Sequence, residues 1–207
     1  MRIKLPQLYP ITDARLSGLS HAEQVERFGR GGATLVQLRE KHQSPREFYR
    51  AAEEALARAR QLNMRLIIND RVDIALAIGA DGVHLGQDDL PPAAARELLG
   101  DEAIIGFSTH TLEQASAAAR MPVDYIAIGP IFNTSSKENP DAVVGLEGLR
   151  SVRRAVGQLP LVAIGGITDE TARSTIMTGA DSIAVISLLL KNPANISAQV
   201  RELLAKL

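Results

Sequence analysis

A glutamine and two basic side chains alternate along one segment of this 207-residue chain. In the run Gln37-Leu38-Arg39-Glu40-Lys41, the side chains of Gln37, Arg39 and Lys41 would point to one side, because successive residues of a strand face opposite ways. Two cations that face the same way suit a ligand with several negative charges. A solvated strand end is the alternative, and the run alone does not decide between the two.

Acidic residues follow two further apolar runs. Asn69 and Asp70 come directly after one of them, and Asp89 comes shortly after the next. Each of the three could serve only to cap the following helix, since Asn and Asp are common helix caps. Taken together with the two cations, Asp70 and Asp89 instead predict oxygen ligands for Mg²⁺, which binds through one or two carboxylates plus substrate phosphate.

Mostly hydroxyl-bearing residues follow the later apolar runs: Ser108, Thr134, Ser135, Ser136, Lys137, Gly166, Ile186 and Ser187. The segment 129–145 has no periodicity, and a connection of that length is uncommon unless it is a lid or a binding loop. Gly166 would let a phosphate approach the backbone closely, although turn chemistry also explains a glycine there. His84 has no second histidine at ligand spacing, so we expect a satisfied interior residue.

The composition excludes several classes of protein and site. Without cysteine there can be no disulfide scaffold, thiolate zinc site, iron–sulfur cluster or cysteine nucleophile. The 23 basic residues nearly balance the 24 acidic ones, so no general attraction to nucleic acid or to an anionic membrane is expected. No apolar run is long enough for a membrane span or a signal peptide, which predicts a cytoplasmic protein and leaves a homodimer open.

Eight short apolar runs recur along the chain with helical patterns between them, and these elements must position the polar residues. The runs cover residues 8–12, 35–38, 66–68, 82–85, 104–107, 125–128, 161–164 and 182–185. Nearly continuous apolar runs are typical of strands buried on both faces of a parallel sheet. Ser20 and Ser44 each begin a capping-box pattern before a helix. The pattern predicts one α/β domain over residues 1–207, a single (β/α)₈ TIM barrel, in preference to a doubly wound open sheet.

Such a barrel would bring the polar residues together, because its active site forms at the carboxyl ends of the strands. The basic and acidic residues would then form a Mg²⁺ and diphosphate site over strands two to four. Loops seven and eight of these barrels frequently bind phosphate through backbone N–H groups, which predicts a monophosphate site around Gly166 and Ser187. Two phosphorylated substrates that meet across one barrel mouth indicate a transferase.

The chain resembles the thiamine phosphate synthase (thiamine-phosphate pyrophosphorylase) family over nearly its whole length. The motifs that carry the resemblance are Leu8-Tyr9-Pro10-Ile11-Thr12-Asp13, Gln37-Leu38-Arg39-Glu40-Lys41, Ile68-Asn69-Asp70-Arg71, Gly82-Val83-His84-Leu85-Gly86-Gln87-Asp88-Asp89, Gly129-Pro130-Ile131-Phe132 and Ala163-Ile164-Gly165-Gly166-Ile167. The resemblance implies Mg²⁺-dependent transfer of a hydroxymethylpyrimidine group from its diphosphate to a carboxylated hydroxyethylthiazole phosphate. The implied products are thiamine monophosphate, diphosphate and CO₂.

The resemblance also implies a role for each site residue. Asp70 and Asp89 would hold Mg²⁺. The residues that would bind the pyrimidine diphosphate are Gln37, Arg39, Lys41, Asn69, Ser108 and Lys137. Those that would be catalytic are Arg39, Lys41, Ser108 and Lys137. The residues that would bind the thiazole phosphate are Thr134, Ser135, Ser136, Gly166, Ile186 and Ser187. The family commonly has a threonine where this chain has Ser136, a change that keeps the hydroxyl.

Three alternatives to the synthase are open. The related thiazole tautomerases share the barrel but would need only the monophosphate half, so the retained basic and acidic residues favour the synthase. A phosphate-binding isomerase would not explain basic residues that face two acids. A non-enzymatic sensor of thiamine precursors is the third alternative. The expected partners are two small phosphorylated substrates, with no nucleic acid and no membrane.

Overall fold

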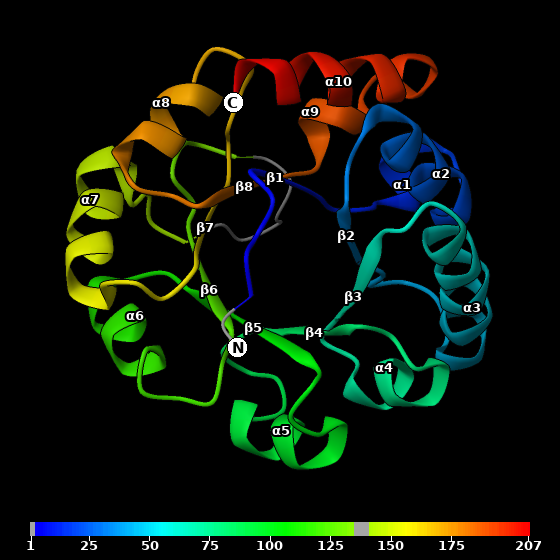
Figure 1. Cartoon of the computed structure of the whole chain (residues 1–207), viewed down its shortest axis with the longest axis horizontal. Helices are drawn as coiled ribbons and strands as arrows, with labels where there is room; N and C mark the ends of the chain where they lie inside the picture. The colour runs from blue at the N-terminus through cyan, green and yellow to red at the C-terminus, as the bar shows by residue number, and fades with distance from the viewer. Residues whose placement is uncertain (1–2, 135–140) are drawn as a thin grey trace.

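The computed structural model describes residues 3–134 and 141–207, which form eight parallel strands surrounded by helices (Figure 1). The strands are β1 (Leu8–Pro10), β2 (Leu35–Leu38), β3 (Arg65–Asn69), β4 (Gly82–Leu85), β5 (Ile104–Thr109), β6 (Tyr125–Ile128), β7 (Leu161–Ile164) and β8 (Ser182–Val185). The α-helices are α1 (Ala14–Ser17), α2 (His21–Gly31), α3 (Pro45–Gln61), α4 (Val72–Ile78), α5 (Pro92–Leu99), α6 (Leu112–Ala118), α7 (Gly145–Val156), α8 (Ala172–Thr178), α9 (Ser187–Leu190) and α10 (Ile196–Lys206), with a 3₁₀ turn at Pro193–Asn195.

The strands form one ring. Their order in the sheet is β1-β8-β7-β6-β5-β4-β3-β2. A parallel bridge between Ile11 and Gln37 joins the two ends of that order, and the Thr12 N–H donates to the Gln37 carbonyl at 2.9 Å. The predicted (β/α)₈ barrel is therefore confirmed, and the doubly wound open sheet is wrong.

Alternation along the strands divides the core into two layers. Leu8, Val36 and Ile68 belong to the larger apolar cluster, which packs the outer face of the barrel against the helices. Tyr9 and Leu35, on the opposite face of the same strands, belong to a smaller cluster inside the barrel. Because the inward direction repeats every second residue, it continues past the strand ends and places polar side chains at the mouth of the barrel.

The helix signals in the sequence act as predicted. The Ser44 hydroxyl accepts from the Glu47 N–H while the Glu47 carboxylate accepts from the Ser44 N–H, and Ser20 forms the same capping box with Glu23. Gly179 ends α8 with a left-handed φ of 128°. The capping boxes fix where α2 and α3 begin, and the glycine fixes where α8 ends.

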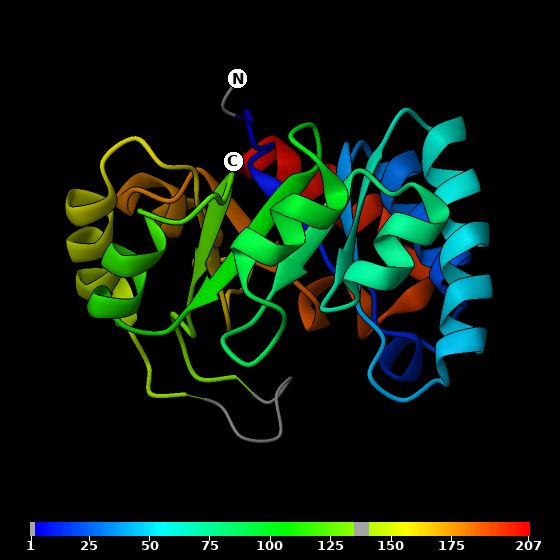
Figure 2. The same cartoon turned by 90° about the horizontal axis from the view of Figure 1, so that it is seen from below.

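The two ends of the barrel differ. Figure 2 shows the termini at one end and the loop that leaves β6 at the other, the end to which the strands run. Within residues 3–134 and 141–207, no helix is long and apolar enough to cross a membrane.

Candidate active site

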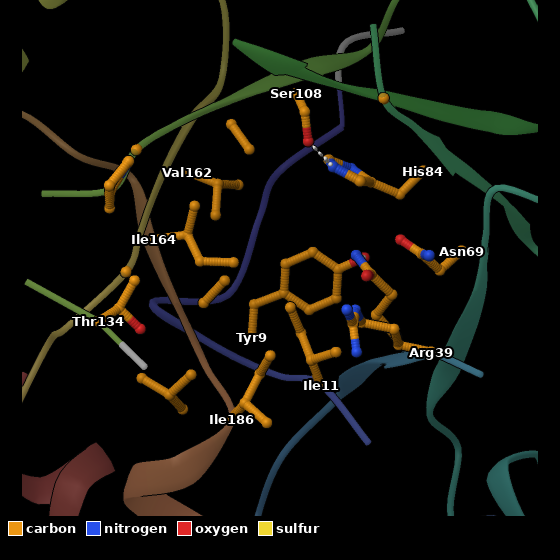
Figure 3. A pocket seen from close by; sticks show the side chains of 18 of the residues that line it. Tyr9, Ile11, Arg39, Asn69, His84, Ser108, Thr134, Val162, Ile164 and Ile186 are labelled. Atoms are coloured by element: carbon orange, nitrogen blue, oxygen red, sulfur yellow. Dashed lines mark hydrogen bonds between the residues drawn. The ribbon is translucent and has the colours of Figure 1, made fainter. Parts of the chain in front are cut away.

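A cavity of about 580 Å³ opens at the carboxyl ends of the strands (Figure 3). The predicted site residues that line it are Gln37, Arg39, Lys41, Asn69, Asp70, Asp89, Ser108, Thr134, Gly166, Ile186 and Ser187. Three further predicted residues, Ser135, Ser136 and Lys137, lie outside the described part of the chain. Every predicted site residue that the structure describes is thus brought to one cavity.

The segment after β2 carries its cations into the cavity, as the alternation predicted. Arg39 lies 3.8 Å from the Asp13 carboxylate, and Lys41 forms an ion pair with Asp70. Gln37 is almost fully buried and donates through Nε2 to the Tyr9 hydroxyl at 3.2 Å. Each cation is therefore paired with an acidic side chain, with which an anionic ligand would compete.

The two predicted acids do not cap helices. α4 begins after Arg71 and α5 after Pro91, and neither helix has a side-chain cap hydrogen bond. Asp70 instead has a left-handed backbone, with φ at 63°, and its N–H donates to the His84 carbonyl at 2.8 Å. Aspartate tolerates this conformation better than most residues, and such strain is concentrated at functional sites. The helix-capping alternative is therefore wrong for both carboxylates.

Asp89 lies in an environment that disfavours its own charge. Burial raises the pKa of Asp89, and the neighbouring Asp70 carboxylate raises it further, while the Gly86 N–H and Lys41 oppose the shift. The Gly86 N–H donates to Asp89 Oδ2 at 2.6 Å. Two carboxylates that repel each other beside a cavity are a donor set that a hard divalent cation suits. The described residues contain no cluster of three or more His, Asp or Glu side chains able to hold a metal.

His84 is the satisfied interior histidine that the sequence predicted. Its ring nitrogens lie 2.9 Å from the Tyr125 hydroxyl and 2.9 Å from the Ser108 hydroxyl. Burial lowers the pKa of His84 to about 4, against a smaller opposing effect of Asp89. The imidazole is therefore neutral at physiological pH and acts as a hydrogen-bonding group rather than as a cation.

A second buried histidine, which the sequence analysis missed, supports the segment that carries the cations. His21 contacts the Thr12 hydroxyl at 2.7 Å and the Glu40 carboxylate at 3.2 Å. Thr12 in turn accepts from the Arg39 N–H at 3.2 Å. Burial lowers the pKa of His21, although Glu40 opposes that shift. The capping box that begins at Ser20 predicted the helix, but nothing in the pattern indicated that its first residue points at the end of β2.

The opposite wall of the cavity is built from glycines and apolar side chains. Gly165 and Gly166 both have left-handed backbones, with φ at 97° and 66°. A Cβ atom on Gly166 would lie 2.3 Å from the Asn133 carbonyl oxygen, so the two loops are in backbone contact. Figure 3 shows Val162, Ile164 and Ile186 on this wall, across from Arg39 and Asn69. Arg39 and Lys41 thus lie in one half of the cavity, which we call the charged half. The half around Gly165 and Gly166 has no Lys or Arg among its described lining residues, its ionisable groups being the paired His110 and Asp141, and we call it the uncharged half.

Comparisons with known proteins point to one family. A family model described as thiamine monophosphate synthase matches residues 8–189. The chain is 49% identical to a thiamine-phosphate synthase of Clostridium novyi, over 90% of this chain and 91% of that protein. It is 48% identical to a thiamine-phosphate synthase of Koribacter versatilis, over 98% and 97%. A solved structure of a thiamine phosphate pyrophosphorylase from Pyrococcus furiosus matches with a TM-score of 0.87 and 38% identity, covering 97% of this chain and 94% of that one.

Proposed function

The chain belongs to the thiamine monophosphate synthase family, and from this premise we propose how its own residues carry out the reaction. The enzyme is a transferase of thiamine biosynthesis that moves a pyrimidinylmethyl group and releases pyrophosphate. Its substrates are small phosphorylated molecules. Because such charged metabolites do not cross membranes unaided, a cytoplasmic location is part of the proposal.

The charged half of the cavity is the proposed site of the pyrimidine diphosphate. Arg39 and Lys41 face this half, and a diphosphate would compete with Asp13 and Asp70 for them. Gln37, Asn69 and Ser108 line the same half and would contact the pyrimidine end. Lys137, which lies outside the described residues, is proposed to contact the diphosphate because of its place in the sequence after β6.

Asp70 and Asp89 are the proposed Mg²⁺ ligands. The observation that supports them is the raised pKa of Asp89 beside Asp70, which a divalent cation would relieve. Mg²⁺ bound there would neutralise part of the charge on the diphosphate. Lys41 would then be released from Asp70 to contact the diphosphate directly.

The uncharged half is the proposed site of the thiazole phosphate. Gly166, Ile186 and Ser187 line it from the loops after β7 and β8, the part of such barrels that frequently binds phosphate. Thr134 lines it from the loop after β6, and Ser135 and Ser136 follow directly in the sequence. Backbone N–H groups and hydroxyls can hold a phosphate here without placing a second set of cations beside the first.

The reaction then needs charge stabilisation and alignment rather than a side-chain nucleophile. The bond between the pyrimidine methylene carbon and the diphosphate oxygen breaks, and its electron pair leaves with the diphosphate, which Arg39 and Lys41 stabilise. The thiazole nitrogen donates its lone pair to the methylene carbon. Loss of CO₂ from the carboxylated thiazole leaves an electron pair on the ring carbon, which takes up a proton. Holding the two substrates across one mouth supplies the alignment.

A thiazole tautomerase is the second candidate, because it would use only the uncharged half of the cavity. The residues of the charged half favour the synthase over the tautomerase, since a site for a monophosphate alone would not need two cations opposite two acids. The experiment that separates the two is a coupling assay with both substrates, run with Mg²⁺ and with EDTA.

The matched variants for this assay are Asp70→Ala and Asp73→Ala. Asp73 is exposed on α4 and pairs with Arg71, so its removal tests the loss of a carboxylate near the site without touching the cavity. We expect thiamine phosphate from the wild type and from Asp73→Ala with Mg²⁺, and none from Asp70→Ala. Full activity of Asp70→Ala in EDTA would refute the metal assignment, and absence of coupling in the wild type would favour the tautomerase.

A further inference from the structure

Five side chains from five strands form one continuous hydrogen-bonded chain beneath the cavity. Gln37 Nε2 donates to the Tyr9 hydroxyl at 3.2 Å, and the Tyr9 and Tyr125 hydroxyls lie 3.0 Å apart. The Tyr125 hydroxyl lies 2.9 Å from His84 Nδ1, and His84 Nε2 lies 2.9 Å from the Ser108 hydroxyl, the bond drawn in Figure 3. The chain thus connects β2, β1, β6, β4 and β5 in that order.

The hydrogen bonds of this series all run in one direction, from Gln37 to Ser108, because a tyrosine hydroxyl has only one hydrogen to donate. Tyr9 accepts from the Gln37 amide, and the Tyr125 hydroxyl is the one other described group bonded to its buried hydroxyl, so the hydrogen of Tyr9 goes to Tyr125 rather than being left without an acceptor. Tyr125 then has to donate to His84 Nδ1. A neutral imidazole with an accepting Nδ1 carries its hydrogen on Nε2, and this hydrogen is donated to Ser108.

The two ends of the hydrogen-bond chain, Gln37 and Ser108, line the substrate cavity, and so do Tyr9 and His84 between them. Since Ser108 accepts from His84, its own hydroxyl hydrogen is left to donate into the cavity. Gln37 commits an amide hydrogen to Tyr9, and its carbonyl oxygen has no partner among the described side chains and backbone groups. The groups left for a ligand are therefore the carbonyl oxygen and the second amide hydrogen of Gln37 at one end, and the hydroxyl hydrogen of Ser108 as a donor at the other.

Ring packing and a glycine hold the hydrogen-bonded side chains in place. Tyr9 and Tyr125 are essentially fully buried, with their rings edge to face and their centroids 6.0 Å apart. The rings of His84 and Tyr125 stack with centroids 5.5 Å apart. A Cβ atom on Gly106 would lie 2.3 Å from the Tyr125 hydroxyl and 2.6 Å from His84 Nδ1, so only glycine leaves room for this contact.

We propose that Tyr9, Tyr125 and His84 are positioning residues that set the specificity for the pyrimidine by locking this hydrogen-bond chain in one direction. The inference rests on the proposed function of the charged half of the cavity. An aminopyrimidine carries a donor, its amino group, beside an acceptor, a ring nitrogen, and this pair complements Gln37 and Ser108. An analogue with a carbonyl oxygen in place of the amino group carries the reverse pair. Reversing the chain would therefore reverse the preference.

The first test needs no substrate and reads the tautomer of His84 by ¹⁵N NMR of histidine-labelled protein, with the His84 signals identified by their loss in His84→Gln. We expect the hydrogen on Nε2 in the wild type. In Gln37→Glu an ionised carboxylate can only accept, so Tyr9 donates to residue 37, Tyr125 donates to Tyr9, and His84 donates to Tyr125. The ring hydrogen of His84 then lies on Nδ1. The double variant Tyr9→Phe/Gln37→Glu breaks the link, so its tautomer should match that of Tyr9→Phe. A wild-type hydrogen on Nδ1, or no change in Gln37→Glu, would overturn the inference.

The second test compares Tyr125→Phe with Tyr49→Phe, the same change at an exposed tyrosine of α3 that bonds Glu53. The measured quantities are the dissociation constants of the aminopyrimidine diphosphate and of its carbonyl analogue. We expect Tyr125→Phe to reduce the preference for the amino compound by about tenfold, the worth of one hydrogen bond, and Tyr49→Phe to leave it unchanged. An undiminished preference in Tyr125→Phe would overturn the specificity role. If the tautomers behave as expected but neither diphosphate binds, the proposed function fails and the specificity role fails with it.

Discussion

The contact between the loops after β6 and β7 allows a sharp test at Gly166. Replacing Gly166 with alanine would place a Cβ atom 2.3 Å from the Asn133 carbonyl oxygen and 2.7 Å from the Phe132 carbonyl oxygen. Both atoms belong to backbone rather than to a flexible side chain, so one of the two loops has to move. These loops carry Thr134 and Gly166, which face the proposed thiazole phosphate.

Gly18 provides the matched control for the size of the effect. It has nearly the same left-handed backbone, with φ at 69° against 66° for Gly166, but nothing lies within 4 Å of the Cβ position. The left-handed conformation costs an alanine about 1 kcal/mol. Gly18→Ala should therefore lose about that much stability, while Gly166→Ala should lose a further 1–3 kcal/mol, roughly the cost of overpacking.

Urea unfolding and steady-state kinetics measure the two effects separately. Because a shift of about 1 Å at a site can reduce the rate on the order of 100-fold, we expect kcat/KM for the thiazole phosphate to fall by about that factor in Gly166→Ala. Gly18→Ala should keep the wild-type value, since Gly18 lies outside the cavity. Equal stability of the two variants, or an unchanged kcat/KM in Gly166→Ala, would refute the steric argument.

Three further outcomes are expected. Burial lowers the pKa of His84 from 6.5 to about 4, so the unfolded protein binds the proton more tightly than the folded protein does. As the pH falls from 8 to 5, the free energy of unfolding of the wild type, measured in urea relative to that of His84→Gln, should therefore fall by about 2 kcal/mol. Asp124→Ala removes the carboxylate that accepts from Arg96 and from the Ile105 N–H, while Arg96 keeps its bonds to backbone carbonyls; the loss should cost about 2 kcal/mol in thermal unfolding, with KM unchanged. His21→Phe should raise the KM of the pyrimidine diphosphate more than His21→Gln does, because only glutamine can still bond Glu40; equal values would contradict the positioning role.

Much of the fold could be predicted because its signals act over a few residues. The capping boxes at Ser20 and Ser44 are local features that form whenever the helix forms. Alternation after β2 likewise placed Gln37, Arg39 and Lys41 on one face, and the structure confirms that all three line the cavity.

Other features of the site depended on contacts that no local pattern encodes. Asp70 and Asp89 were each compatible with capping the next helix, and only the observed starts of α4 and α5 exclude that role. The support of Arg39 by His21 was not predicted, because the strength of a cap says nothing about where the first residue of the helix points.

The sequence by itself determined the eight alternating strands and helices, the face on which the cations lie and the absence of any thiol chemistry. Only the tertiary structure decided that Tyr9 and Tyr125, 116 residues apart, meet beside His84 inside the barrel. The physical reason is that caps and alternation arise within a turn or a strand. The contacts across a barrel depend on how the ring of strands closes, which is settled by the packing of the whole core.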